Sequence, residues 1–255
     1  MSIVSGFADI SLVQLLLVAG VALFASVVGG LAGYGTGALM PLVLVPLIGA
    51  EPVVPIIAIS SIFTNLSRTA AYLRYADRRR ALIVILAAAL TTALGAYGYT
   101  RLTNAGAALV IGTMLISSVP LRRLARRREV RIGDSGLAAS AVGYGVVVGG
   151  TSGSGVILLS LLMAAGLEGA AVIATDAVIS VATSVIKISV FGLSGVVTAQ
   201  VLAFALLIGI IAIPGAFLAR AFVERMQVHI HTAILDAAVI TGGVVMISTA
   251  LRQLL

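Results

Sequence analysis

Residues 28–37 of the chain are Val28-Gly29-Gly30-Leu31-Ala32-Gly33-Tyr34-Gly35-Thr36-Gly37. The glycine spacing of this stretch recurs 120 residues later, in Val148-Gly149-Gly150-Thr151-Ser152-Gly153-Ser154-Gly155. Neither stretch contains a charge, and both lie between apolar segments. Because glycine lets the backbone turn sharply and lets other groups approach it closely, the stretches predict two matched turns, one in each half of the chain.

The chain around these turns is too apolar for a water-soluble protein. Of its 255 residues 60% are hydrophobic and 10% are charged, and its mean hydropathy is +1.20. Polar and charged residues must cover a soluble domain, whereas apolar runs of roughly 17–25 residues recur here and can each cross a bilayer. Because the runs lack the alternation of a membrane β-barrel, they predict an all-α, polytopic transmembrane helical bundle.

The apolar runs predict helices whose lengths differ in an informative way. We expect them at 10–28, 38–49, 52–73, 81–100, 104–120, 135–149, 155–166, 168–192, 198–220 and 231–251. The runs that follow the glycine stretches have about 12 residues, which as helix cover only ~18 Å of a ~30 Å hydrocarbon core. We therefore expect each glycine stretch to be the tip of a re-entrant or broken helical hairpin, followed by three spanning helices.

Arginines gather in three short connections between the apolar runs. These are Arg74 with Arg78–Arg80, then six arginines within 122–131, then Arg220 and Arg225. If the glycine stretches are hairpin tips, all three connections lie on the cytoplasmic side, as positively charged loops usually do. If each stretch instead crosses the membrane once, the third connection moves outside. The pattern predicts a multi-pass protein of the cell inner membrane, and it argues against nucleic-acid binding despite a net charge of +7.

A second pair of motifs indicates an internal repeat. Ser61-x-x-Thr64-Asn65-x-x-Arg68 matches Ser180-x-x-Thr183-Ser184-x-x-Lys187 with an offset of 119 residues. Three crossings after each tip would make the two halves face opposite ways, which is the inverted repeat of many secondary transporters. We expect a first repeat at 1–121, a basic cytoplasmic linker at 122–134 and a second repeat at 135–255, with a binding site where the repeats meet.

The glycine turns indicate binding of an anion. A helix that begins after Gly37 or Gly155 directs its free N–H groups back at the turn, and these groups carry partial positive charge. The alternative is that the glycines only allow close helix packing, as in the GxxxG motif.

A polar stripe follows the second turn. Asp176, Ser180, Thr183 and Lys187 are spaced 4, 3 and 4 residues apart and so share one helix face. Lys187 is the only lysine of the chain, inside an apolar run where a charge is costly unless it is paired or wetted. Alternatively, Lys187 and Arg68 snorkel to the headgroups, and the hydroxyls bond their own helix backbone. Asp176 pairs with a cation, binds a proton or sits in water, which makes it a candidate for ion coupling.

Other chemistries lack their residues. The chain has no cysteine, and its two histidines, His229 and His231, fall in a stretch that predicts a polar loop. No nucleotide-binding P-loop and no hydrolase motif is present. We therefore expect no enzyme activity, no metal and no cofactor.

The paired Gly-Gly-x-x-Gly-x-Gly segments, each followed by a short apolar run and a helix with a Ser/Thr/Asn stripe, resemble the TauE/SafE sulfite exporter family. The resemblance covers nearly the whole chain and implies export of sulfite, sulfoacetate or other organosulfonates, driven by an ion gradient. The second half lacks the proline that Pro41 supplies in the first. Carried over, the resemblance implies a substrate region formed by Gly33, Gly35, Gly37, Ser61, Thr64, Asn65, Arg68, Gly153, Ser154, Gly155, Ser180, Thr183, Ser184 and Lys187.

Three functions stay open at this point. The first is a secondary transporter of small sulfur-containing anions that works by alternating access. The second is an anion channel that uses the same site, and the third is a non-transporting membrane scaffold. The expected partners are a small anionic substrate and the lipid bilayer, and small-residue helix faces permit a homodimer.

Overall fold

The computed structural model of the chain describes residues 3–8, 10–32, 35–127, 131–223 and 228–254. Within these ranges all regular structure is helical, which confirms the all-α prediction. The elements are η1 (Ile3–Phe7), α1 (Leu12–Ala32), α2 (Gly35–Ile48), α3 (Val53–Tyr72), η2 (Leu73–Tyr75), α4 (Arg78–Tyr99), α5 (Asn104–Arg127), α6 (Asp134–Gly150), α7 (Gly155–Ala164), α8 (Gly169–Leu193), α9 (Ala199–Val223) and α10 (Val228–Leu254).

The helices form a bundle suited to a bilayer. The described part of the chain has five helical segments long and apolar enough to cross a membrane, namely 53–75 (α3 with η2), 78–99, 104–121, 169–193 and 236–254. The outer face of α4 carries leucines at four-residue spacing that are 57–71% exposed, namely Leu82, Leu86, Leu90 and Leu94. Such a stripe of exposed leucines fits a lipid environment, because water would disfavour it.

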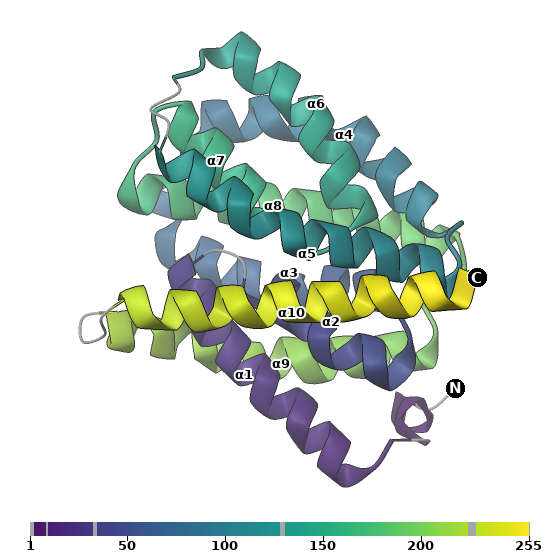
Figure 1. The fold of residues 1–255 in the computed structure, drawn as a ribbon. Coiled ribbons are helices and arrows are strands. Elements are labelled where there is room, and N and C mark those ends of the chain that lie inside the picture. The colour runs from purple at the N-terminus through teal and green to yellow at the C-terminus, as the bar shows by residue number, and fades with distance from the viewer. Residues whose placement is uncertain (1–2, 9, 33–34, 128–130, 224–227, 255) are drawn as a thin grey trace.

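Polar contacts show which helix ends lie together. At one end, Arg79 at the start of α4 pairs with Asp134 at the start of α6 at 2.6 Å. There the N–H of Ile132 also donates to the carbonyl of Ala164 at 2.9 Å, so α6 begins where α7 ends. Helices α6 and α7 therefore form a hairpin, as predicted for the second half. Both chain termini lie at the opposite end of the bundle (Figure 1).

Several helices extend beyond the apolar runs that predicted them. Arg78–Arg80, expected in a connection, form the first turn of α4, where the carboxylate of Asp77 accepts the N–H of Arg80 at 3.0 Å. His229 and His231, expected in a polar loop, lie in the first turn of α10. The prediction was wrong there because helices are propagated by backbone hydrogen bonds, which need no apolar side chains.

The glycine stretches are shorter breaks than expected. Helix α1 continues to Ala32 and α6 to Gly150, so the first two glycines of each stretch are helical. In α6 they serve the alternative role of close packing. A Cβ on Gly149 would lie 2.2 Å from the carbonyl oxygen of Thr92 on α4. The second turn is therefore confined to 151–154, whereas Gly33 and Tyr34 of the first stretch lie outside the described residues.

Gly149→Val should destabilise the protein by at least about 1–3 kcal/mol, because α4 and α6 would have to separate to admit the side chain. The matched control is Gly143→Ala on the same helix, where a Cβ would meet nothing within 4 Å. That change should be neutral or stabilising by up to about 1 kcal/mol, since alanine favours helix. Thermal melting of the detergent-purified variants measures both. Equal melting temperatures would contradict the assignment of Gly149 to helix packing.

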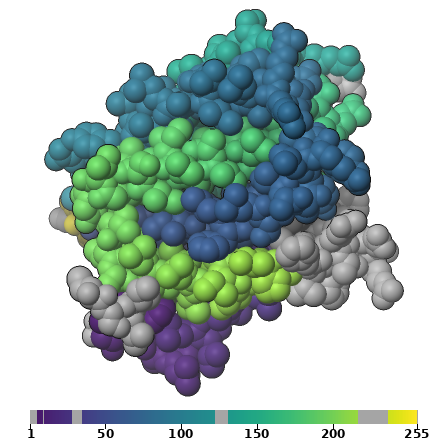
Figure 2. Space-filling model, turned by 180° about the vertical axis from the view of Figure 1, so that it is seen from behind, coloured from purple at the N-terminus to yellow at the C-terminus, as the bar shows by residue number. Residues whose placement is uncertain are grey.

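Helices of the two sequence halves pack across one another. Helix α1 packs on α9, and its counterpart α6 packs on α4. In the same way α3 contacts α9 while α8 contacts α4, and α5 lies against α10. At the centre, α3 and α8 lie side by side, with α4 and α9 on either side of them (Figure 2). Helices α3 and α8 carry the polar stripes and so position the site.

Candidate functional site

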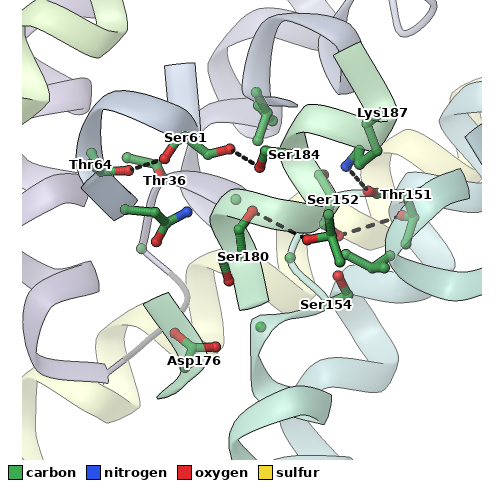
Figure 3. A pocket seen from close by; sticks show the side chains of 18 of the residues that line it. Thr36, Ser61, Thr64, Thr151, Ser152, Ser154, Asp176, Ser180, Ser184 and Lys187 are labelled. Carbon is green, nitrogen blue, oxygen red and sulfur yellow. Dashed lines mark hydrogen bonds between the residues drawn. The ribbon is translucent and has the colours of Figure 1, made fainter. Parts of the chain in front are cut away.

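A cavity of about 130 Å³ lies between α3, α8, the N-terminus of α2 and the turn that precedes α7. Every predicted site residue in the described part of the chain lines it (Figure 3). These residues are Gly35, Gly37, Ser61, Thr64, Asn65, Arg68, Gly153, Ser154, Gly155, Asp176, Ser180, Thr183, Ser184 and Lys187. Two motifs 119 residues apart in sequence thus face one space.

The N-terminus of α2 meets the second glycine turn at this cavity. A Cβ on Gly37 of α2 would lie 3.0 Å from the backbone N of Gly153, so a side chain there would press α2 away from that turn. Gly153 itself has φ +81, a left-handed conformation that L side chains rarely adopt. Glycine is therefore required on both sides of the contact.

Two helices begin at the cavity. Helix α7 starts at Gly155 as predicted, whereas α2 starts at Gly35, three residues earlier than expected. No side chain caps α7, because Ser154 at its N-cap makes no capping hydrogen bond. Uncapped N–H groups at a helix N-terminus leave partial positive charge facing the cavity.

Arg68 and Asp176 form an ion pair between α3 and α8. The Nη2 of Arg68 donates to Oδ2 of Asp176 at 3.0 Å, and its Nη1 donates to the amide oxygen of Asn65 at 3.2 Å. The side chains are only 13% and 2% exposed, so Arg68 does not snorkel to a headgroup. Among the described residues, Nε of Arg68 and Oδ1 of Asp176 are buried without a hydrogen-bond partner.

Lys187 is buried further along α8. It is 6% exposed, and its ammonium donates to the carbonyl oxygen of Thr151 at a long 3.4 Å. No carboxylate lies within 4.0 Å of it in the described part of the chain. Figure 3 shows Lys187 and Asp176 at opposite sides of the site, as expected of residues 11 positions apart on one helix. Snorkelling is therefore wrong for Lys187 as well.

The hydroxyl groups bond both between helices and within their own helices. The hydroxyls of Ser61 and Ser184 lie 2.9 Å apart and join α3 to α8, while the Ser61 hydroxyl also donates to the carbonyl oxygen of Ala58 on its own helix at 2.9 Å. Thr64 and Thr183 donate to carbonyls of their own helices, at 3.0 and 3.2 Å, so the alternative of local backbone bonding holds for them. A threonine hydroxyl can turn toward a guest by rotation about its C–O bond.

The sequence did not predict every lining residue. Thr36, Thr151 and Ser152 also line the cavity, and their place inside the glycine stretches was an available signal. The hydroxyl of Ser152 is buried and has no partner among the described residues. Ser26 and Tyr144 line the cavity from α1 and α6, and nothing in the sequence marks them.

A bundle of spanning helices around a small polar cavity, lined by two buried cations and by the N-termini of α2 and α7, defines a multi-pass membrane protein with a solute-sized internal site. The chain belongs to the sulfite exporter TauE/SafE family, whose model matches residues 18–246. This membership confirms the resemblance noted from the glycine motifs and makes the chain a member of a transporter family. No curated protein and no solved structure matches the chain with significant similarity.

Proposed function

We propose that the chain is a secondary transporter that exports small sulfur-containing anions, such as sulfite, sulfoacetate or other organosulfonates, by alternating access. The observation that carries the proposal is a set of buried donors with incomplete hydrogen bonding around one cavity. They are the ammonium of Lys187, Nε of Arg68 and the hydroxyl of Ser152. A buried donor without an acceptor costs about 1–3 kcal/mol, and an oxyanion brings several acceptors at once.

The size of the cavity supports a small substrate. By this measure of volume a water molecule needs roughly 10–15 Å³, so about 130 Å³ holds several waters or one compact oxyanion. Sites for drug-sized ligands are roughly 300–1,000 Å³. A sulfite or sulfonate group is compact and presents three oxygens, which matches donors that converge from α3, α8 and the helix N-termini.

An inverted repeat of 1–121 and 135–255, joined by the 122–134 linker, supplies a route to alternating access. The packing between the halves supports this repeat. The first helix of the first half, α1, packs on α9 of the second half, and the first helix of the second half, α6, packs on α4 of the first. The Arg68–Asp176 and Ser61–Ser184 bonds both join the halves and would have to change as one half rocks against the other. Asp176 is the candidate for coupling to an ion.

The placement of charge supports residence in the cell inner membrane with the basic connections in the cytoplasm. The Arg79–Asp134 pair brings the starts of α4 and α6, and with them two of the basic connections, to one end of the bundle. The proposed partners are the small anionic substrate and the bilayer, and the helix surfaces permit a homodimer.

Counterflow in proteoliposomes tests the function. Unlabelled sulfite inside the vesicles should speed the uptake of labelled sulfite several-fold, because a carrier loaded on both faces reorients without a slow empty step. A channel would show flux that follows voltage without stimulation from the far side. A scaffold would show no flux above that of protein-free vesicles. Either of these results would contradict the proposal.

A further inference from the structure

Three charged residues belong to the described lining of the cavity, and their net charge limits which ions the cavity can bind. Arg68 and Lys187 are cations and Asp176 is an anion, so the fully ionised cavity carries one net positive charge. Asp176 is bonded to Arg68 through one carboxylate oxygen, while the other oxygen is buried without a partner in the described part of the chain. Arg68 in turn keeps an unused donor at Nε.

We infer that Asp176 occupies on Arg68 the place that the transported anion takes, and that a divalent anion binds together with one proton on Asp176. The inference rests on the proposed function and names its substrate class and its coupling ion. In the empty cavity the carboxylate of Asp176 pairs with the guanidinium of Arg68 and neutralises its charge. When the anion arrives, its oxygens replace the carboxylate on Arg68, and Asp176 loses its counter-charge.

Charge balance supplies the reason for the proton. A divalent anion in the fully ionised cavity leaves one net negative charge buried, which a low-dielectric site disfavours strongly. One proton from the aqueous phase, bound by a carboxylate oxygen of Asp176, restores neutrality. A monovalent anion reaches neutrality without a proton. On release the proton leaves Asp176 for water and the carboxylate returns to Arg68, so no covalent bond changes except O–H.

The surroundings of Asp176 leave few other proton carriers. From α3 it faces Arg68, and from α6 the phenol of Tyr144 lines the same cavity. On α8 the only other charged residue in the cavity is Lys187. At the start of α4, Asp77 is paired with Arg80 at 3.2 Å and does not line the cavity. Asp176 is thus the one acid in the described lining.

The test counts the protons taken up when sulfite binds. Purified protein is titrated calorimetrically with sulfite, at a pH where sulfite is divalent, in two buffers that differ in ionisation enthalpy. We expect about one proton per sulfite for the unmodified chain and about none for Asp176→Asn. The matched control is Asp134→Asn, a half-buried acid outside the cavity that also pairs with an arginine, and it should keep an uptake of about one.

These variants distinguish protonation of Asp176 from protonation of sulfite itself and from binding without a proton. If sulfite itself took up the proton, Asp176→Asn would retain the uptake, and this result would overturn the inference. Binding by the unmodified chain without proton uptake would also overturn it, while exchange in proteoliposomes would leave the proposed function standing. Absence of both exchange and binding would remove the two together. Should Asp176→Asn not fold, Asp176→Ser also leaves Arg68 and Lys187 to balance a divalent anion, and it should bind sulfite without proton uptake.

Discussion

Replacing Lys187 with methionine should reduce sulfite counterflow roughly 10- to 100-fold while leaving the protein folded. A hydrogen bond to a charged group contributes about 1.5–3 kcal/mol. The ammonium of Lys187 has no carboxylate partner in the described structure, so it is available to bind the anion. Methionine keeps the length of the side chain and removes the cost of burying a charge, so the melting temperature should stay the same or rise. Counterflow rates and melting curves measure the two effects.

Arg101→Met is the matched control for the loss of charge. Arg101 is exposed, lies over the ring of Tyr97 at 5.0 Å and is not part of the cavity lining. Its replacement should leave counterflow unchanged. Lys187→Arg restores a cation and should recover part of the rate. If Lys187→Met exchanged sulfite at the rate of the unmodified protein, Lys187 would be a structural residue and not a substrate ligand.

Gly153→Val should abolish counterflow and also lower stability. A residue other than glycine in the left-handed region costs roughly 1–2 kcal/mol, and a β-branched residue is especially disfavoured there. At φ +81 a Cβ on Gly153 would lie 3.4 Å from the carbonyl oxygen of Gly37, so the larger valine would press the turn away from the N-terminus of α2. The N-terminus of α7 would then no longer face the cavity as it does now. Counterflow and thermal melting are again the measurements.

Gly195→Val separates backbone strain from the geometry of the cavity. Gly195 has φ +74, close to that of Gly153, but a Cβ there would meet nothing within 4 Å, and it lies after α8, away from the cavity. It should therefore lose a similar amount of stability from strain and keep its counterflow. If both variants lost transport equally, the turn at 151–154 would have no role beyond folding.

Much of the candidate site could be predicted from sequence because its residues repeat. The hydroxyls of Ser61 and Ser184 belong to matched motifs, and they meet directly at 2.9 Å. Spacing alone placed Asp176 and Lys187 on one helix face, since helical periodicity is a local property. Tyr144 and Ser26 could not be found in this way, because their positions in the lining depend on how α6 and α1 pack.

Hydropathy, helix length and glycine content act locally, so the amino-acid sequence was sufficient to predict a bundle of membrane helices interrupted at two glycine stretches. The role of each charged and each small residue depends, in contrast, on how the helices pack. Arg68 and Lys187 occupy matching positions, yet only Arg68 has an acid facing it, because the first half carries Ile57 where the second carries Asp176. Gly149 packs against α4, where the carbonyl of Thr92 approaches it, whereas Gly153 lies in a turn that Gly37 of α2 approaches. Such pairings depend on helices far apart in sequence, and only packing brings them together.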